Sequence, residues 1–230
     1  MAAQGPAPAP RAPANGRWVV LDVGETLVDE TRVFSIWADV LGIPRFTLMA
    51  VLGATIVDGQ NQWHGFFELL GVEDWRAIAP QVEERYGGFQ AGDLYPDALP
   101  AIDGLKRAGY GVAVVANQPG ARHAQLEALE VRVDVMAMSE TMGVAKPDPA
   151  FYERTLELLG RPSPADVAYV GDRIDNDVVP SAAAGMRAVW IRRGPWGYLH
   201  RDETGAAVLE VRNLDELVER IAHAWPGEAS

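Results

Sequence analysis

Residues 18–26 read WVVLDVGET, an apolar run that ends abruptly at Asp22 and leads into a polar turn around Gly24. A short continuous apolar run is typical of a strand that is buried on both faces of a parallel sheet. Similar runs, separated by helical patterns, follow at residues 112–116, 133–138, 167–170 and 188–191. This alternation predicts βαβ units, and hence an α/β fold built on a parallel sheet.

Three segments outside the predicted strands carry apolar residues at helical spacing. These residues are Ala98, Ile102 and Leu105, then Tyr152, Leu156 and Leu159, then Leu214, Leu217 and Ile221. Asp148 before Pro149 predicts a helix N-cap, and Asn213 with Glu216 three residues later resembles a capping box. Gly185 suits the position after a helix end, where a positive φ is favoured. These signals place helices between the predicted strands and after the last one.

The chain divides into segments of different composition. Its 230 residues, of which 48% are hydrophobic, are enough to bury a full core. Residues 1–16 are mostly Ala, Pro and Gly, which predicts a disordered tail. Residues 31–94 show helical periodicity without a convincing strand. We therefore expect a small α-helical cap domain at 31–94, inserted into an α/β core that comprises residues 17–30 and 95–230.

The overall composition excludes several classes of protein. No cysteine is present, so disulfide frameworks and thiolate chemistry are excluded, and nothing points to an oxidising compartment. A total of 20 Lys and Arg against 32 Asp and Glu gives a formal charge of −12, which disfavours nucleic acid and anionic membranes as partners. No segment has the apolar length of a signal peptide or membrane span. We expect a cytoplasmic monomer or homodimer that acts on a small molecule.

The residues that follow the predicted strands suggest a ligand site, because the carboxyl ends of parallel strands face a common crevice. They include Asp22, Asn117, Lys146, Asp172 and Asp177. Clustered carboxylates repel one another unless a cation lies among them, and oxygen ligands suit Mg²⁺. A lysine can neutralise a phosphoryl group beside the metal, and a carboxylate opposite the metal can attack phosphorus in line. We predict a site for Mg²⁺ and a phosphate-like anion, with Asp22 as the candidate nucleophile.

In their order and separation these segments resemble the haloacid dehalogenase-like (HAD) superfamily of phosphohydrolases, dehalogenases and phosphonate hydrolases. The resemblance rests on Asp22 and Thr26 after the first strand, on residues 144–149 around Lys146, and on residues 169–172. It extends to Asp177, five residues beyond Asp172. The helical insertion directly after the first motif is similar to the subfamily with a helical cap.

The resemblance implies a Rossmann-like HAD core and assigns roles to residues. Asp22 and Lys146 would be catalytic, with Asp22 as the nucleophile. The implied metal ligands are Asp22, Gly24 through its carbonyl, Asp172 and Asp177, the last by binding through water or by orienting a ligand. The implied phosphate-binding residues are Gly24, Glu25, Ala116, Asn117 and Lys146. The expected cofactor is Mg²⁺.

Two positions depart from the family pattern. Gly24 stands where the phosphatases of the family usually have a second Asp, the acid/base that protonates the leaving oxygen. General acid–base help is worth ~10²–10⁴ in rate, so another group would have to supply it. The candidates for this acid/base are three residues close to Asp22 in the sequence, Glu25, Asp29 and Glu30, and one residue of the expected cap, His64. Ala116 stands where the family usually has Ser or Thr, and Asn117 or Gln118 could supply the missing donor.

Three functions remain open from the sequence. The first is a Mg²⁺-dependent phosphatase-like hydrolase that acts through an aspartyl phosphate on a small phosphorylated metabolite, favouring leaving groups that need no protonation. The second is a metal-binding pseudoenzyme with a regulatory or partner-binding role. The third is a dehalogenase, against which the acidic residues 172–177 argue, because that reaction needs no metal. Phosphonate hydrolysis through a cap lysine is disfavoured, since residues 31–94 contain no lysine.

Overall fold

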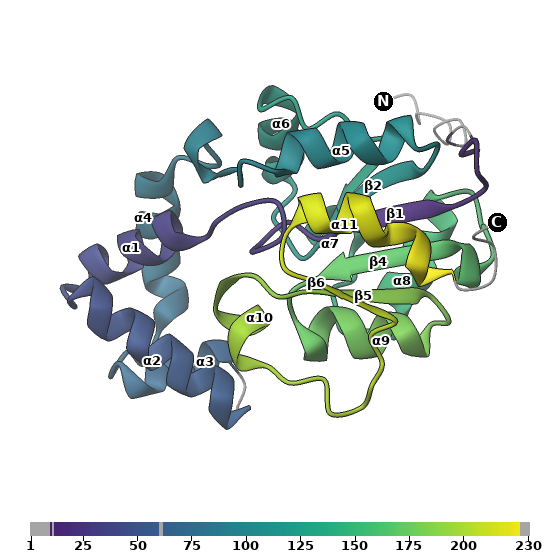
Figure 1. Cartoon of the computed structure of the whole chain (residues 1–230). Coiled ribbons are helices and arrows are strands. Elements are labelled where there is room, and N and C mark those ends of the chain that lie inside the picture. The colour runs from purple at the N-terminus through teal and green to yellow at the C-terminus, as the bar shows by residue number, and fades with distance from the viewer. Residues whose placement is uncertain (1–9, 11, 60–61, 226–230) are drawn as a thin grey trace.

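The computed structural model describes residues 10, 12–59 and 62–225 of the chain. Its strands form one parallel sheet in the order β3-β2-β1-β4-β5-β6 (Figure 1). The strands are β1 (Trp18–Leu21), β2 (Gly111–Ala116), β3 (Val135–Met138), β4 (Val167–Gly171), β5 (Arg187–Ile191) and β6 (Leu209–Val211). The predicted α/β fold with a parallel sheet is therefore confirmed.

The sequence pattern missed strand β6 at the edge of the sheet. It consists of three residues, of which Leu209 and Val211 are buried and Glu210 is exposed. Such a short strand, with only two apolar side chains, does not produce the continuous apolar run of a strand buried on both faces. Strand β3 begins at Val135, two residues later than the predicted run.

The central strand β1 divides the core into two layers. Val19 and Leu21 pack in one hydrophobic cluster with residues of α5 and α11, whereas Trp18 and Val20 pack in another with residues of α8. This division follows from the period of two along a strand, which sends successive side chains to opposite faces. The helices of this part are α5 (Ala98–Arg107), α6 (Ala121–Ala128), α7 (Ser139–Met142), α8 (Pro149–Leu158), α9 (Val179–Ala183), α10 (Gly194–Leu199) and α11 (Leu214–Arg220).

The predicted helix ends are confirmed except for one detail. The Asp148 carboxylate accepts a hydrogen bond from the backbone N–H of Ala150, and Gly185 has a φ of +82°. The Asn213 side chain accepts from Glu216 N at 2.8 Å. The Glu216 carboxylate, however, accepts from Arg212 N rather than from Asn213 N, so only half of the capping box forms.

Four helices form a bundle to one side of the sheet (Figure 1). They are α1 (Thr31–Leu41), α2 (Arg45–Asp58), α3 (Gln62–Leu69) and α4 (Trp75–Tyr86). This helical bundle has its own hydrophobic cluster, which includes Phe34, Phe66 and Phe67, and which Trp196 of α10 joins from the sheet side. Among the described residues no single helix is long and apolar enough to cross a membrane, and only α1 with α2, bent by 113°, pass that test as a pair.

The predicted tail at 1–16 falls mostly on residues 1–9 and 11, which lie outside the described residues. Close to its end, Asn15 N donates a hydrogen bond to Gly109 O at 3.2 Å, and Gly16 N donates to Pro13 O. Backbone contacts with the core therefore begin a few residues before the predicted boundary at Arg17.

Candidate active site

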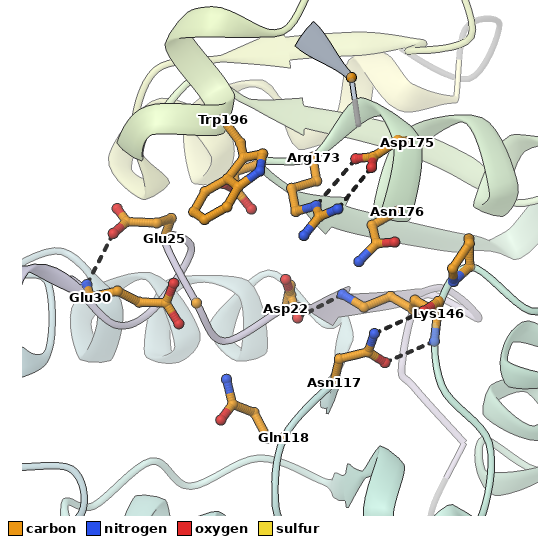
Figure 2. A pocket seen from close by; sticks show the side chains of 14 residues that line it. Asp22, Glu25, Glu30, Asn117, Gln118, Lys146, Arg173, Asp175, Asn176 and Trp196 are labelled. Carbon is orange, nitrogen blue, oxygen red and sulfur yellow. Dashed lines mark hydrogen bonds and ion pairs between the residues drawn. The ribbon is translucent and has the colours of Figure 1, made fainter. Parts of the chain in front are cut away.

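A cavity of about 640 Å³ lies at the carboxyl ends of β1, β2 and β4, on the side of the sheet that faces the helical bundle. Asp22 and Gly24 follow β1, Asn117 follows β2, and Asp172 follows β4. Lys146 reaches it from the segment before α8 (Figure 2). The cavity is therefore where the topology of a parallel sheet predicts a ligand site.

Three buried carboxylates meet at the wall of this cavity. Asp22, Asp172 and Asp177 each offer an oxygen, and these oxygens lie within 4.8 Å of one another. Asp177 lies in a π-helical turn, Ile174–Val178, and its Oδ2 accepts a hydrogen bond from Arg173 N at 2.9 Å. A Cβ at Gly171 would lie only 2.3 Å from Asp177 Cγ, so this glycine makes room for the carboxylate.

Lys146 is the cation of the cluster. Its Nζ lies 2.8 Å from Asp22 Oδ1 and 2.5 Å from Asp177 Oδ1, and the side chain is buried. Burial by itself lowers the pKa of this ammonium group, but the carboxylates of Asp177 and Asp22 outweigh that effect and raise it. Lys146 therefore stays charged at neutral pH.

Asn117 holds the lysine segment in place. Its Oδ1 accepts a hydrogen bond from Lys146 N at 2.8 Å, and its Nδ2 donates to Lys146 O at 2.9 Å (Figure 2). Both ends of the amide are therefore engaged with the backbone of Lys146. Ala116, the other predicted phosphate-binding residue of this strand, packs in the hydrophobic core, while Asn117 and Gln118 line the cavity.

The charge of the cluster fits a bound cation. Oδ2 of Asp172 is buried and has no hydrogen-bond partner among the described residues. Burial, followed by the neighbouring Asp177 and Asp22, raises the pKa of the Asp172 carboxyl well above its ordinary value. One lysine balances only one of the three carboxylates. An all-oxygen donor set with excess negative charge suits a hard divalent cation.

Glu25, predicted to bind phosphate and also considered as an acid/base, points away from the nucleophile. Its Oε2 accepts a hydrogen bond from the Tyr95 hydroxyl at 2.6 Å, and its Oε1 accepts from Glu30 N at 3.0 Å. Figure 2 shows its carboxylate turned away from Asp22. The residue has a φ of +51°, in the left-handed region that few side chains adopt. Glu25 therefore shapes the turn after β1.

Glu30 lies at the cavity instead. Its carboxylate lies beside Gly24 and is directed toward Asp22 (Figure 2). Burial, with smaller contributions from Glu25 and Asp22, raises the pKa of Glu30 to about 8. Of the other two candidates, Asp29 accepts a hydrogen bond from Thr31 N, and His64 is exposed on α3. Of the four acid/base candidates, the structure directs only Glu30 toward the nucleophile.

Sequence reasoning did not assign Arg173 or Trp196 to the site, yet both line the cavity. The Arg173 guanidinium donates to both Asp175 oxygens, at 3.2 and 2.7 Å, and lies 5.4 Å from the centre of the Trp196 ring. Trp196 belongs to the segment after β5. Its place agrees with the rule that ligand residues follow the carboxyl ends of parallel strands.

Comparisons with known proteins agree with this architecture. Residues 17–185 match the family model described as haloacid dehalogenase-like hydrolase. The chain is similar to a glyceraldehyde 3-phosphate phosphatase of Methanopyrus kandleri, with 34% identity over 132 residues that make up 54% of this chain and 55% of that protein. It is similar to a phosphoserine phosphatase of Thermus thermophilus, with 33% identity over 104 residues, 44% of this chain and 41% of that protein.

Among solved structures, the chain is similar to a HAD phosphatase from Thermococcus onnurineus, with a TM-score of 0.58 and 25% identity. That match covers 90% of this chain and 98% of the other. The matches to the two curated relatives, by contrast, span about half the length of each protein or less. The likeness to them therefore concerns part of each protein.

Proposed function

Because the chain belongs to the haloacid dehalogenase-like hydrolase family, we propose that it is a Mg²⁺-dependent phosphohydrolase acting through an aspartyl phosphate on Asp22. The observation that carries the proposal is the buried group formed by Lys146 and the three carboxylates, with Asp22 open to the cavity. Two relatives of the chain are named as phosphatases, which supports a small phosphorylated metabolite as the substrate.

Mg²⁺ would be held by the carboxylates of Asp22 and Asp172 and by the carbonyl of Gly24, with Asp177 binding through water or orienting a ligand. When bound, the metal would supply positive charge for the oxygens of the transferred phosphoryl group. Lys146 would neutralise that group from another side. The partnerless oxygen of Asp172 supports this assignment, since a buried carboxylate oxygen without a partner is costly.

Asp22 is the group that reacts in both chemical steps. In the first, one Asp22 oxygen attacks phosphorus, the new O–P bond forms, and the bond to the leaving oxygen breaks. In the second, water attacks the phosphorus of the aspartyl phosphate, which releases inorganic phosphate and restores the Asp22 carboxylate. Asn117 supports both steps by fixing the backbone of Lys146.

The pseudoenzyme hypothesis, prompted by Gly24, remains as the competing proposal, whereas the buried carboxylate cluster counts against dehalogenation. The test is an assay of the purified protein with Mg²⁺ on acetyl phosphate, p-nitrophenyl phosphate and a panel of metabolite phosphates. Asp22→Asn serves as the inactive variant, and Asp103→Asn, on the exposed face of α5, as the matched control. We expect turnover by the wild type and by Asp103→Asn only. Mg²⁺ binding without turnover of any substrate would support the pseudoenzyme.

A further inference from the structure

We propose that Glu30 is the general acid and base of this site, and that its carboxyl group replaces the side chain that Gly24 lacks. This inference rests on the proposed phosphohydrolase activity. It concerns a residue that comes eight positions after the nucleophile, at the entry to α1, rather than in the turn that follows β1.

The first argument is the space that Glu30 occupies. A Cβ built on Gly24 would lie 2.7 Å from Glu30 Oε1, 2.9 Å from its Cδ and 3.3 Å from its Oε2. A side chain at position 24 and the present position of the Glu30 carboxyl therefore exclude each other. The carboxyl group lies where a side chain two residues after Asp22 would begin.

The second argument is the way the surrounding contacts hold Glu30. Its backbone N–H donates to Glu25 Oε1, and its carbonyl accepts from Phe34 N at 3.1 Å in the first turn of α1. The side-chain carboxylate makes no hydrogen bond or ion pair with the described residues, and it lines the cavity. The backbone is therefore fixed while the carboxyl group remains available to a substrate.

The other carboxylates that line the cavity are committed elsewhere. Glu25 accepts from Tyr95 and from Glu30 N, and Asp175 pairs with Arg173. Asp172 belongs to the buried cluster around Lys146. Among the described residues this leaves Glu30 as the carboxyl group able to exchange a proton with the leaving oxygen.

The proton balance of the two steps is complete with Glu30 in this role. As the bond from phosphorus to the leaving oxygen breaks, the Glu30 carboxylic acid gives its proton to that oxygen, and an alcohol leaves. In the second step the Glu30 carboxylate takes a proton from water while the water oxygen bonds to phosphorus and the bond to Asp22 breaks. Inorganic phosphate leaves, and both carboxyl groups return to their starting states.

The test uses the dependence of kcat/KM on the leaving group, since kcat/KM covers only the steps up to its departure. Wild type, Glu30→Gln and the control Asp29→Asn are compared with Mg²⁺ on glycerol 2-phosphate, p-nitrophenyl phosphate and acetyl phosphate. For Glu30→Gln we expect a fall of about 100-fold or more on glycerol 2-phosphate, whose alkoxide needs a proton, and of less than about 5-fold on acetyl phosphate. A burst of p-nitrophenol is also expected, because the second step loses its base.

Equal losses on all three substrates, or no loss, would overturn the role of Glu30. If Glu30→Gln does not fold, the double variant Gly24→Asp/Glu30→Ala replaces it. In this variant the carboxyl group of the introduced aspartate would occupy the space that the Glu30 carboxyl group leaves. Its turnover of glycerol 2-phosphate would support the proposal, and turnover of acetyl phosphate alone would overturn it. A wild-type protein inactive on every substrate would instead overturn the proposed function, and this inference with it.

Discussion

Replacing Asp172 with Asn should stabilise the metal-free protein, although it removes a proposed metal ligand. The substitution keeps the shape of the side chain and removes one of three charges whose oxygens lie within 4.8 Å of one another. At an effective dielectric constant of about 20, two unit charges at this separation repel by about 3.5 kcal/mol. Loss of the charge removes two such repulsions and one attraction to Lys146. The free energy of unfolding of the metal-free protein should therefore rise by about 3 kcal/mol.

Proton uptake sets a ceiling on this gain. The wild-type Asp172 carboxylate can avoid the repulsion by taking up a proton. Protonating a carboxylate with the ordinary Asp pKa of about 3.9 costs about 5 kcal/mol at pH 7.5. The expected gain lies below that ceiling. At about 2–4 °C per kcal/mol for a chain of this size, the Tm of Asp172→Asn in EDTA should exceed that of the wild type by about 6–12 °C.

The advantage of the variant should depend on pH and on Mg²⁺. Because burial raises the pKa of Asp172, the folded protein holds this proton to higher pH than the unfolded chain, and metal-free stability falls as pH rises above about 4. The two Tm values should therefore converge near pH 4 and separate toward pH 7.5. Mg²⁺ at about 100 times its dissociation constant should stabilise the wild type by about 2.7 kcal/mol and the variant much less.

Differential scanning fluorimetry at several pH values, with EDTA or Mg²⁺, measures these effects, and Asp103→Asn is the matched control. That residue is exposed on α5, so its substitution should change neither the metal-free Tm nor the response to Mg²⁺. A metal-free Asp172→Asn protein that is no more stable than the wild type would refute the reasoning. It would mean that the cluster carries no uncompensated charge.

Two further predictions concern packing and ion pairs. Gly171→Ala should lower stability by about 1–3 kcal/mol and reduce activity, because the new Cβ would displace the Asp177 carboxylate, whereas Gly92→Ala, with nothing within 4 Å, should not. Arg32→Met should lower the free energy of unfolding by about 3 kcal/mol, because it removes the cation that pairs with the buried Asp93 carboxylate at 2.6 Å and leaves that charge only neutral hydrogen-bond donors. Arg45→Met, which breaks an exposed pair in the same bundle, should leave the free energy of unfolding nearly unchanged. Urea denaturation monitored by circular dichroism measures the free energy of unfolding of all four variants. Equal losses for Gly171→Ala and Gly92→Ala would contradict the first prediction, and equal losses for Arg32→Met and Arg45→Met would contradict the second.

The convergence of the acidic cluster could be predicted from the sequence. Asp22 and Asp172 each come directly after a strand core of four or five apolar or small residues, and adjacent parallel strands bring their carboxyl ends to one edge of the sheet. Lys146 was indicated by its segment before the N-cap of α8. The geometry agrees with these expectations, and the roles assigned to the residues are what the experiments above examine.

The contrast between Glu25 and Glu30 could not be predicted in the same way. Both are glutamates near the nucleophile, and the side chain nearer in sequence is the one that turns away. The reason lies in tertiary structure, because the Tyr95 hydroxyl, 70 positions along the chain, holds one oxygen of Glu25, and Glu30 N holds the other. A Cβ at Gly194 would overlap the Glu25 carboxylate at 2.3 Å, so this residue also depends on the segment after β5.

The relation between Gly24 and Glu30 changes how the missing aspartate is interpreted. From the sequence, Gly24 indicates a site that has lost its proton donor, which led to the pseudoenzyme hypothesis. In the structure the same glycine is what allows the Glu30 carboxyl to reach the cavity. A donor in the turn after β1 would be fixed to the sheet, whereas Glu30 begins the first helix of the bundle. The distance between Glu30 and Asp22 therefore depends on two attachments, the hydrogen bond from Glu30 N to Glu25 in the turn after β1 and the packing of α1 in the bundle, which Trp196 joins.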